Sequence, residues 1–212
     1  MQPRVSAATP LILGSQSPRR RDLLAQLGLP HWVAVAEVDE RVLAGEEPGD
    51  YLERIAAAKL EAVGGLAAVR ERTREAPHAL LVADTTVVCQ GEILGKPSDA
   101  DEAFAMLTRL AGRTHEVMTR FALGVAFRGD ARLVTAHTEL TRVTFRACSP
   151  AWLRRYAESG EGLDKAGAYA GQGLGSFLIS RLEGSYTNVV GLPVAQVVEA
   201  LERLGWLEAF PL

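Results

Sequence analysis

An arginine-rich segment between an apolar strand and a helix constrains this chain more than any other feature. Residues 11–13 predict a buried strand, and the run Ser17-Pro18-Arg19-Arg20-Arg21 follows after a short connection. Ser17 is a preferred N-cap and Pro18 suits the first helical position, so a helix begins here, and Gly28 ends it. The arginines then lie in the first turn, where the helix dipole disfavours positive charge. This pattern predicts a bound anion such as a phosphate, with a solvated basic helix start as the alternative.

Composition excludes several classes of protein. A formal net charge of −3 over 212 residues is too acidic for a general nucleic-acid binder, so we expect no nucleic acid polymer as a partner. No apolar stretch approaches membrane-span length, so we expect no membrane association and a cytoplasmic protein. Cys89 and Cys148 lack metal-ligand spacing and are expected to be reduced thiols.

The pattern of apolar residues predicts a mixed chain of strands and helices. The expected strands are 11–13, 32–38, 80–90, 115–127, 132–145 and 176–182, with a hairpin turn at 91–92. The expected helices are 18–27, 51–69, 98–110 (with Ser98 as N-cap), 150–158 and 193–204. We predict a flexible leader over 1–9 and a single domain over 10–212. Its fold class is α/β (α+β), with a mixed, elongated central sheet, flanking helices and two lobes around a cleft.

Asp84 is the most informative single residue, because a carboxylate inside the apolar strand 80–90 is costly without a compensating partner. A carboxylate that only bonds to the strand-end backbone is the structural alternative. Thr85 beside it either orients a ligand or satisfies strand propensity. Lys96 lies in a Gly-Lys-Pro loop from which it can contact a phosphate, although such loops are more often simple surface.

Other charged residues carry weaker signals when the pattern alone is considered. Lys59 interrupts an alanine-rich helix, which favours a solvent-facing lysine. The Asp39-Glu40 pair offers carboxylates for a divalent ion, although most such pairs are exposed and inert. His115 has no evident acid or nucleophile partner and is interpreted as structural. The glycine-rich segment 160–175 is more specific, because glycines permit close backbone approach and Gln172 can read the edge of a nucleobase.

Taken together, the motifs resemble those of the Maf family of nucleoside triphosphate pyrophosphatases, over nearly the whole chain. The matching segments are Ser15-Gln16-Ser17-Pro18-Arg19-Arg20, Ala83-Asp84-Thr85, Gly95-Lys96-Pro97, Gly112-Arg113-Thr114-His115, Asp164-Lys165-Ala166-Gly167-Ala168-Tyr169, Gln172-Gly173, Gly184-Ser185-Tyr186 and Val190-Gly191-Leu192-Pro193. The resemblance implies a fold shared with inosine triphosphate pyrophosphatases, a homodimer, and a nucleoside triphosphate substrate cleaved between its α and β phosphates with Mg²⁺ or Mn²⁺.

The resemblance also implies roles for individual residues. Asp84 corresponds to the general base and, with Glu40, to the metal-binding carboxylates. The substrate-selecting positions correspond to Arg19, Thr85 and Gln172, and the phosphate or substrate contacts to Ser15, Arg20, Lys59, Lys96, Asp164 and Lys165.

The branch of the family follows from the same positions. The branch that acts on 7-methylguanosine triphosphate has a tryptophan at the position of Arg19 and lacks the Asp164-Lys165 pair, and an arginine opposes a cationic base. We therefore expect hydrolysis of dTTP and UTP, with modified pyrimidine triphosphates as further substrates and removal of non-standard nucleotides as a house-cleaning role in nucleotide metabolism. The alternatives are a nucleotide-binding regulator of cell division or septation and a purine (ITP/XTP-type) house-cleaning pyrophosphatase.

Overall fold

The computed structural model describes residues 2–207 and 209–211, so positions 1, 208 and 212 of the predicted leader and domain lie outside the described residues. The strands are β1 (Leu11–Gly14), β2 (His31–Val33), β3 (His78–Cys89), β4 (Glu92–Leu94), β5 (Thr114–Phe127), β6 (Asp130–Phe145) and β7 (Ile179–Glu183). The α-helices are α1 (Pro18–Gln26), α2 (Pro48–Gly64), α3 (Ala67–Arg72), α4 (Ala100–Leu110), α5 (Pro150–Glu158), α6 (Tyr186–Val190) and α7 (Val194–Arg203), and the 3₁₀ helices are η1 (Ala166–Ala168) and η2 (Gly173–Leu178).

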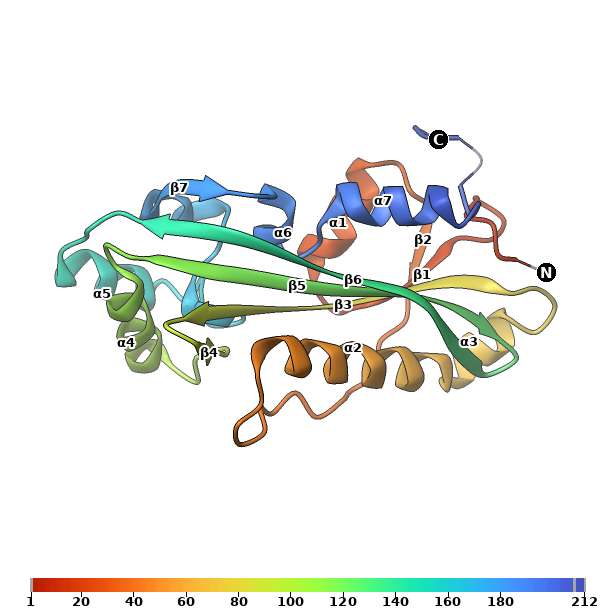
Figure 1. Cartoon of the computed structure of the whole chain (residues 1–212), viewed down its shortest axis with the longest axis horizontal. Helices are drawn as coiled ribbons and strands as arrows, with labels where there is room; N and C mark the ends of the chain where they lie inside the picture. The colour runs from red at the N-terminus through yellow and green to blue at the C-terminus, as the bar shows by residue number, and fades with distance from the viewer. Residues whose placement is uncertain (1, 208, 212) are drawn as a thin grey trace. The chain divides into compact units, whose positions relative to one another are not determined.

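The strands form one mixed sheet in the order β2-β1-β3-β5-β6-β7, with β4 paired to β3 (Figure 1). β1 is parallel to both β2 and β3, whereas the β3–β4 and β6–β7 pairs are antiparallel. The predicted α/β class with a mixed sheet and flanking helices is therefore confirmed.

The chain divides into two compact units. Unit 1 comprises Met1–Asp84, Arg120–Thr138 and Gly191–Leu212, and unit 2 comprises Thr85–Thr119 and Glu139–Val190. Three strands, β3, β5 and β6, contribute residues to both units.

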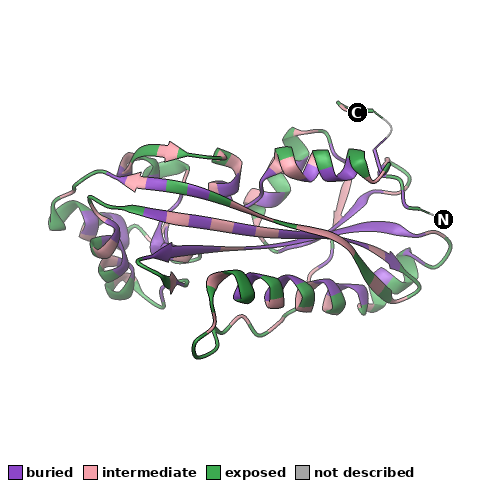
Figure 2. Cartoon of the chain, viewed as in Figure 1, coloured by how far each residue is buried: buried purple, intermediate pink, exposed green. Residues whose placement is uncertain are grey.

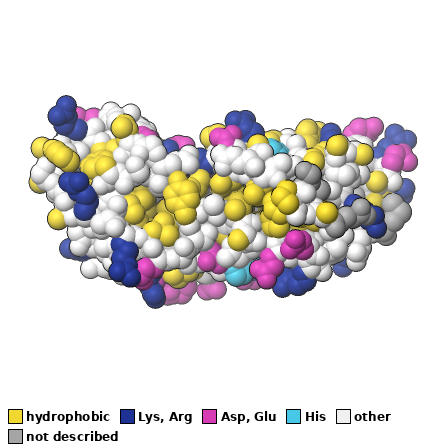
Figure 3. All heavy atoms as spheres, turned by 90° about the horizontal axis from the view of Figure 1, so that it is seen from above, with side chains coloured by type: hydrophobic (Ala, Val, Ile, Leu, Met, Phe, Trp, Pro, Cys, Tyr) yellow, Lys and Arg dark blue, Asp and Glu magenta, His cyan; other side chains and the backbone are white. Residues whose placement is uncertain are grey.

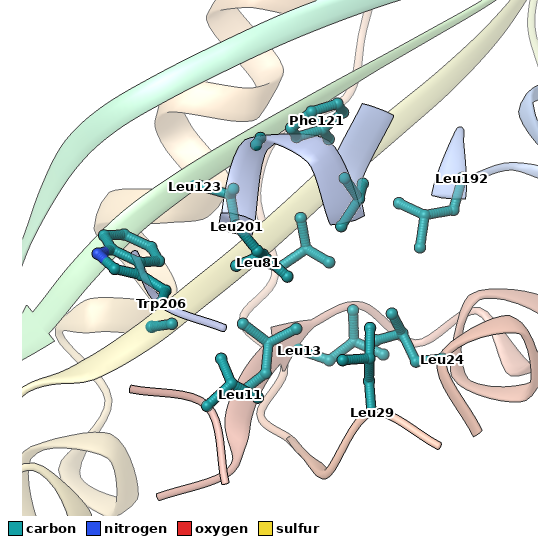
Figure 4. Packing of buried hydrophobic residues seen from close by; sticks show 14 of the residues in the cluster. Leu11, Leu13, Leu24, Leu29, Leu81, Phe121, Leu123, Leu192, Leu201 and Trp206 are labelled. Carbon is teal, nitrogen blue, oxygen red and sulfur yellow. The ribbon is translucent and has the colours of Figure 1, made fainter. Parts of the chain in front are cut away.

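Unit 1 has an apolar cluster on each face of its strands, because successive strand side chains point to opposite faces. On one face, α1 and α7 pack against Leu11, Leu13 and Leu81, together with Trp206 (Figure 4). On the other face, α2 and α3 pack against Ile12 and against those side chains of β3 and β5 that alternate with the side chains of the first face. Strand β3 is buried along nearly its whole length, as Figure 2 shows, which agrees with the apolar residues on both sides of Asp84-Thr85-Thr86.

Unit 2 has its own core between α4, α5 and the ends of β3, β5 and β6 that belong to it. His115 is buried in this core, 2% exposed, and its Nε2 lies 2.8 Å from the Tyr169 hydroxyl. Burial lowers the pKa of His115 to about 4, so the ring is neutral at pH 7. The interpretation of His115 as structural agrees with this environment. Cys89 and Cys148 are free thiols, as expected.

Several element boundaries differ from the sequence prediction. The N-cap of α4 is Asp99, whose carboxylate accepts the Glu102 N–H, while Ser98 donates to the Glu102 carboxylate. Strand β2 ends at Val33, and strand β7 begins only at Ile179 because η2 occupies the preceding residues.

Two helices differ from the prediction. Helix α6, five residues long, was not predicted, and the predicted helix 51–69 is divided near Gly64 and Gly65 into α2 and α3.

The N-terminal residues contact the core of unit 1. Val5 is 5% exposed, belongs to the cluster with Trp206, and donates its N–H to the Trp206 carbonyl. The flexibility of 1–9 and the single-domain boundary stay predictions.

The described surface agrees with the acidic net charge. On the face that Figure 3 shows, lysine and arginine side chains are scattered among acidic ones rather than gathered into one basic patch. No helix in the described part of the chain has both the length and the apolar character needed to cross a bilayer.

Candidate active site

The most concentrated charge in unit 1 is a cluster of Glu40, Lys59 and Asp84, which we call the carboxylate–lysine cluster. The Lys59 ammonium lies 2.7 Å from a Glu40 carboxylate oxygen and 2.6 Å from Asp84 Oδ1. The Lys59 and Asp84 side chains are only 13% and 11% exposed, whereas Glu40 is 38% exposed. Because water screens such buried charges weakly, each carboxylate depends on the ammonium for its stability.

Regular elements hold the cluster in place. Asp84 lies inside β3, and Lys59 projects from α2 on the face that also carries Ile55, Ala56 and Leu60. The prediction of a solvent-facing Lys59 is therefore wrong. Its position falls at the helical spacing of the buried face, and the ammonium is satisfied by two carboxylates rather than by water.

The Asp39-Glu40 pair separates into two roles. The Asp39 carboxylate is bound by the Arg41 guanidinium, with Nη2 2.6 Å from Oδ2, and this hydrogen bonding lowers the pKa of Asp39 to about 2. Glu40 is the member of the pair that forms an ion pair with Lys59.

Tyr51 completes the surroundings of the cluster. Its hydroxyl lies 3.3 Å from the Glu40 carbonyl oxygen, to which it donates. Burial, and after it the negative charges of Asp84 and Glu40, raises the pKa of the Tyr51 hydroxyl. Sequence reasoning missed Tyr51, although it precedes Lys59 by eight residues and therefore lies on the same side of the helix.

The helix that opens with the arginines is built differently from the prediction. Ser17 is the N-cap residue of α1, but its side chain makes no capping hydrogen bond; the Ser15 hydroxyl accepts the Ser17 N–H instead. The Arg20 guanidinium donates to the Ala83 and Gly191 carbonyls, each at 2.7 Å, and to the Ser15 hydroxyl at 3.1 Å.

These protein acceptors account for the burial of the Arg20 guanidinium in the first turn, and the bound anion stays a prediction. Burial lowers the pKa of Arg20, and the nearby Asp84 charge opposes that shift. Arg20 therefore lies next to β3, the strand that carries Asp84. Arg19 is half-buried in the same turn and adds to the local positive charge.

In unit 2, the predicted residues lie on β3 and on two loops. The Thr85 hydroxyl is 2.9 Å from the Thr119 hydroxyl, which in turn donates to the Asn188 carbonyl. Lys96 is exposed, and the carbonyl of the preceding Gly95 accepts the Gly167 N–H at 3.0 Å. The loop that carries Lys96 is therefore tied to the segment that follows Lys165.

The segment 161–175 carries the remaining predicted residues. The Lys165 ammonium donates to the Asp164 carboxylate and to the Glu161 carbonyl, and it is 14% exposed against 62% for Asp164. Gln172 is exposed, and its side chain makes no hydrogen bond with the described residues. Its amide is therefore available to a ligand.

The carboxylate–lysine cluster also decides whether the residues fit a divalent metal. Two carboxylates that share one cation supply the hard oxygen ligands that Mg²⁺ and Mn²⁺ accept. Over the described residues, no group of three or more histidine, cysteine, aspartate or glutamate side chains is placed to hold a metal. The residues present fit a metal that takes one or two protein carboxylates and completes its shell with phosphate oxygens and water.

Comparison with known proteins agrees with these motifs. The Maf-like protein family model matches residues 10–204. Two curated relatives named dTTP/UTP pyrophosphatase are similar to this chain. The one from Myxococcus xanthus is 51% identical over 93% of this chain and 93% of the relative, and the one from Syntrophomonas wolfei is 45% identical over 91% and 96%.

A solved structure is also similar over most of its length. The crystal structure of a nucleoside-triphosphatase / dITP/XTP pyrophosphatase from Mycobacterium abscessus covers 92% of this chain and 97% of that chain, with 12% identity and a TM-score of 0.45. So weak a likeness adds nothing to the assignment, which rests on the family model and the curated relatives: this chain belongs to the Maf family.

Proposed function

We propose that the protein is a nucleoside triphosphate pyrophosphatase, a hydrolase that converts dTTP and UTP to the monophosphate and pyrophosphate. Relatives that carry the name dTTP/UTP pyrophosphatase are 42–51% identical over nearly the full chain, which supports the reaction and the substrate class. The observation that carries the chemistry is the buried carboxylate of Asp84, 2.6 Å from the Lys59 ammonium.

In the proposed reaction, a water oxygen attacks the α-phosphorus and the bond from that phosphorus to the bridging oxygen breaks, so pyrophosphate leaves. Asp84 orients the water and accepts its proton, which is general base catalysis. Lys59 holds the Asp84 carboxylate in place and offsets negative charge near it. We assign phosphate or substrate contacts to Ser15, Arg20, Lys96, Asp164 and Lys165, and choice of the base to Arg19, Thr85 and Gln172.

The cofactor in this proposal is a divalent cation, Mg²⁺ or Mn²⁺, that Asp84 and Glu40 would hold together with phosphate oxygens. Such an ion stabilises the charge of the reacting phosphates. The Lys59 ammonium competes with it for the same carboxylate oxygens, because it contacts both of them. We further propose that the protein is cytoplasmic and forms a homodimer. Light scattering of the purified chain would test the homodimer.

A substrate panel tests the proposed function. Release of pyrophosphate is measured under multiple-turnover conditions for dTTP, UTP, CTP, ITP, XTP and 7-methylguanosine triphosphate, each with Mg²⁺ and with Mn²⁺. We expect the highest kcat/KM for dTTP and UTP. Preference for ITP or XTP would instead indicate the purine enzyme, and tight binding without turnover would indicate a nucleotide-binding regulator of cell division.

A further inference from the structure

Gln172 lies in a short span of chain that is held by Tyr156 at one end and by Glu161 at the other, both in unit 2. Before Gln172, the Ala170 N–H donates to the Tyr156 hydroxyl oxygen at 3.1 Å. After Gln172, the Leu174 N–H donates to Glu161 Oε1 at 2.8 Å and the Gly175 N–H to Glu161 Oε2 at 2.7 Å. We call this arrangement of Tyr156, Glu161 and the three backbone amides the Glu161 clamp.

The two side chains of the Glu161 clamp also hold each other. The Tyr156 hydroxyl donates to Glu161 Oε2 at 2.8 Å, and Tyr156 is 4% exposed on α5, with its ring 5.9 Å from that of Phe177. Because Tyr156 is packed into the core of unit 2, it transmits the rigidity of α5 to the carboxylate. The Glu161 clamp therefore ties the residues around Gln172 to helix α5.

The glycines next to Gln172 permit the clamp to approach so closely. Gly173 has a φ of +72°, and a Cβ there would lie 2.4 Å from Glu161 Oε1. A Cβ at Gly175 would lie 2.5 Å from the Tyr156 hydroxyl oxygen. Close contact with these two side chains thus accounts for Gly173 and Gly175, whereas Gly171 lies against Val189.

Glu161 acts as a charged acceptor in this arrangement. Burial by itself would raise its pKa, but the hydrogen bonds from Tyr156, Leu174 and Gly175 and the charge of Lys165 outweigh burial, and the pKa is lowered overall. The Glu161 carbonyl also accepts a hydrogen bond from the Lys165 ammonium. One residue therefore fixes both Gln172 and Lys165, although no motif in the sequence singled it out.

We propose that Glu161, supported by Tyr156, is a positioning residue that sets base selectivity by fixing the backbone on both sides of Gln172. This inference rests on the proposed function, because it concerns how the pyrimidine triphosphate is chosen. Glu161 acts through Gln172 and through the amides, and it takes no part in the bond cleavage itself.

A double-mutant cycle tests this proposal. The variants are Glu161→Gln, Gln172→Ala and the pair together, and the quantity compared is the ratio of kcat/KM for dTTP or UTP to that for CTP and ITP. We expect Glu161→Gln to lower this ratio about tenfold, the effect of losing one well-placed hydrogen bond, with kcat for the preferred substrate little changed. The pair should match Gln172→Ala alone, because Glu161 acts through that residue.

A charge-matched control is available at the end of α5, the helix that carries Tyr156. Glu158 is exposed at the end of α5, and Glu158→Gln makes the same change of charge three residues from Glu161. It should leave the ratio unchanged. Tyr156→Phe serves as a second variant where Glu161→Gln fails to fold. It removes the acceptor of the Ala170 N–H and should lower the same ratio.

The outcomes separate this proposal from the proposed function. Hydrolysis by the wild-type chain with an unchanged ratio in both Glu161→Gln and Tyr156→Phe would overturn the positioning role alone. Additive effects in the pair would also overturn it, since Glu161 would then act independently of Gln172. A wild-type chain that releases pyrophosphate from none of the triphosphates would overturn the proposed function, and the selectivity role with it.

Discussion

The carboxylate–lysine cluster of unit 1 and the Glu161 clamp of unit 2 hold their residues by different means. In the cluster, side chains from a strand and a helix neutralise one another, and Lys59 and Asp84 are nearly buried. In the clamp, one carboxylate and one hydroxyl bind three backbone amides of a glycine-rich segment. The carboxylate–lysine cluster fixes the positions of charged groups, which suits catalysis. The Glu161 clamp fixes the path of the backbone, which suits selection of a ligand.

Replacing Asp84, the proposed general base in the carboxylate–lysine cluster, tests the catalytic side of this comparison and should have the largest effect. Asp84→Asn keeps the shape of the side chain but removes the proton acceptor. We expect the chain to fold and turnover of dTTP and UTP to fall at least about 10²-fold, the usual contribution of a general base. Release of pyrophosphate is the measurement, and exposed Asp130→Asn is the matched control. Full activity of Asp84→Asn would refute the assignment.

Removing the cation of the cluster should affect both stability and turnover. Lys59→Met fills similar space but leaves Asp84 and Glu40 close together without the ammonium. Because Asp84 is nearly buried, we expect unfolding free energy at pH 7 to fall by about 2–3 kcal/mol, less than for a fully buried pair since Glu40 is 38% exposed.

Urea denaturation measures the loss in Lys59→Met, and pyrophosphate release measures its turnover. Arg181→Met is the control, because its guanidinium pairs with the Glu183 carboxylate and these two side chains are 71% and 50% exposed. An equal loss of stability in both variants would mean that the cluster is no more important for folding than a surface pair.

The core of unit 2 differs from the cluster in that its buried titratable group is neutral. The pKa of His115 is lowered by burial from 6.5 to about 4, so the unfolded chain binds a proton there that the folded chain does not. Stability from this group is complete above pH 6.5 and declines as the pH falls toward 4. We expect a loss of about 2 kcal/mol between pH 7 and pH 5.

Urea denaturation at the two pH values, with wild type and His115→Gln, checks this dependence. The variant should lose less stability than wild type in acid. Equal pH dependence in wild type and His115→Gln would show that other groups govern acid unfolding.

The sequence predicted the regular elements of both units better than it predicted the roles of individual side chains. The long strands β3, β5 and β6 and the helices α4, α5 and α7 were anticipated, because their apolar periodicity and their glycine and proline boundaries are strong local signals. Helix α6 was missed because its five residues are too few to show a helical period of apolar residues.

Side-chain partners were harder, because they depend on which distant elements meet. From the pattern alone Lys59 is interpreted as a surface lysine, and only the packing of α2 on the sheet brings its ammonium to Asp84. The Ala83 and Gly191 carbonyls that accept from Arg20 are likewise distant from it in the sequence. The resemblance to the family supplied Lys59 and Glu40, which the pattern alone would have discarded. Neither the sequence pattern nor the resemblance to the family pointed to Glu161, because its partners include backbone amides, which any sequence provides.

The smallest expected effect concerns the backbone of the Glu161 clamp. A pair of glycine variants separates the effect of a Cβ close to Glu161 from the effect of left-handed backbone strain. Gly173→Ala places a Cβ 2.4 Å from Glu161 Oε1 and at a φ of +72°, whereas Gly91→Ala, also in unit 2, meets nothing within 4 Å at a φ of +82°. Both variants should lose about 1 kcal/mol of unfolding free energy from the left-handed backbone. Only Gly173→Ala must also displace the carboxylate, so only it should lower the selectivity ratio. A ratio that falls equally in both variants would mean that general strain in unit 2, and not the contact with Glu161, controls selection of the base.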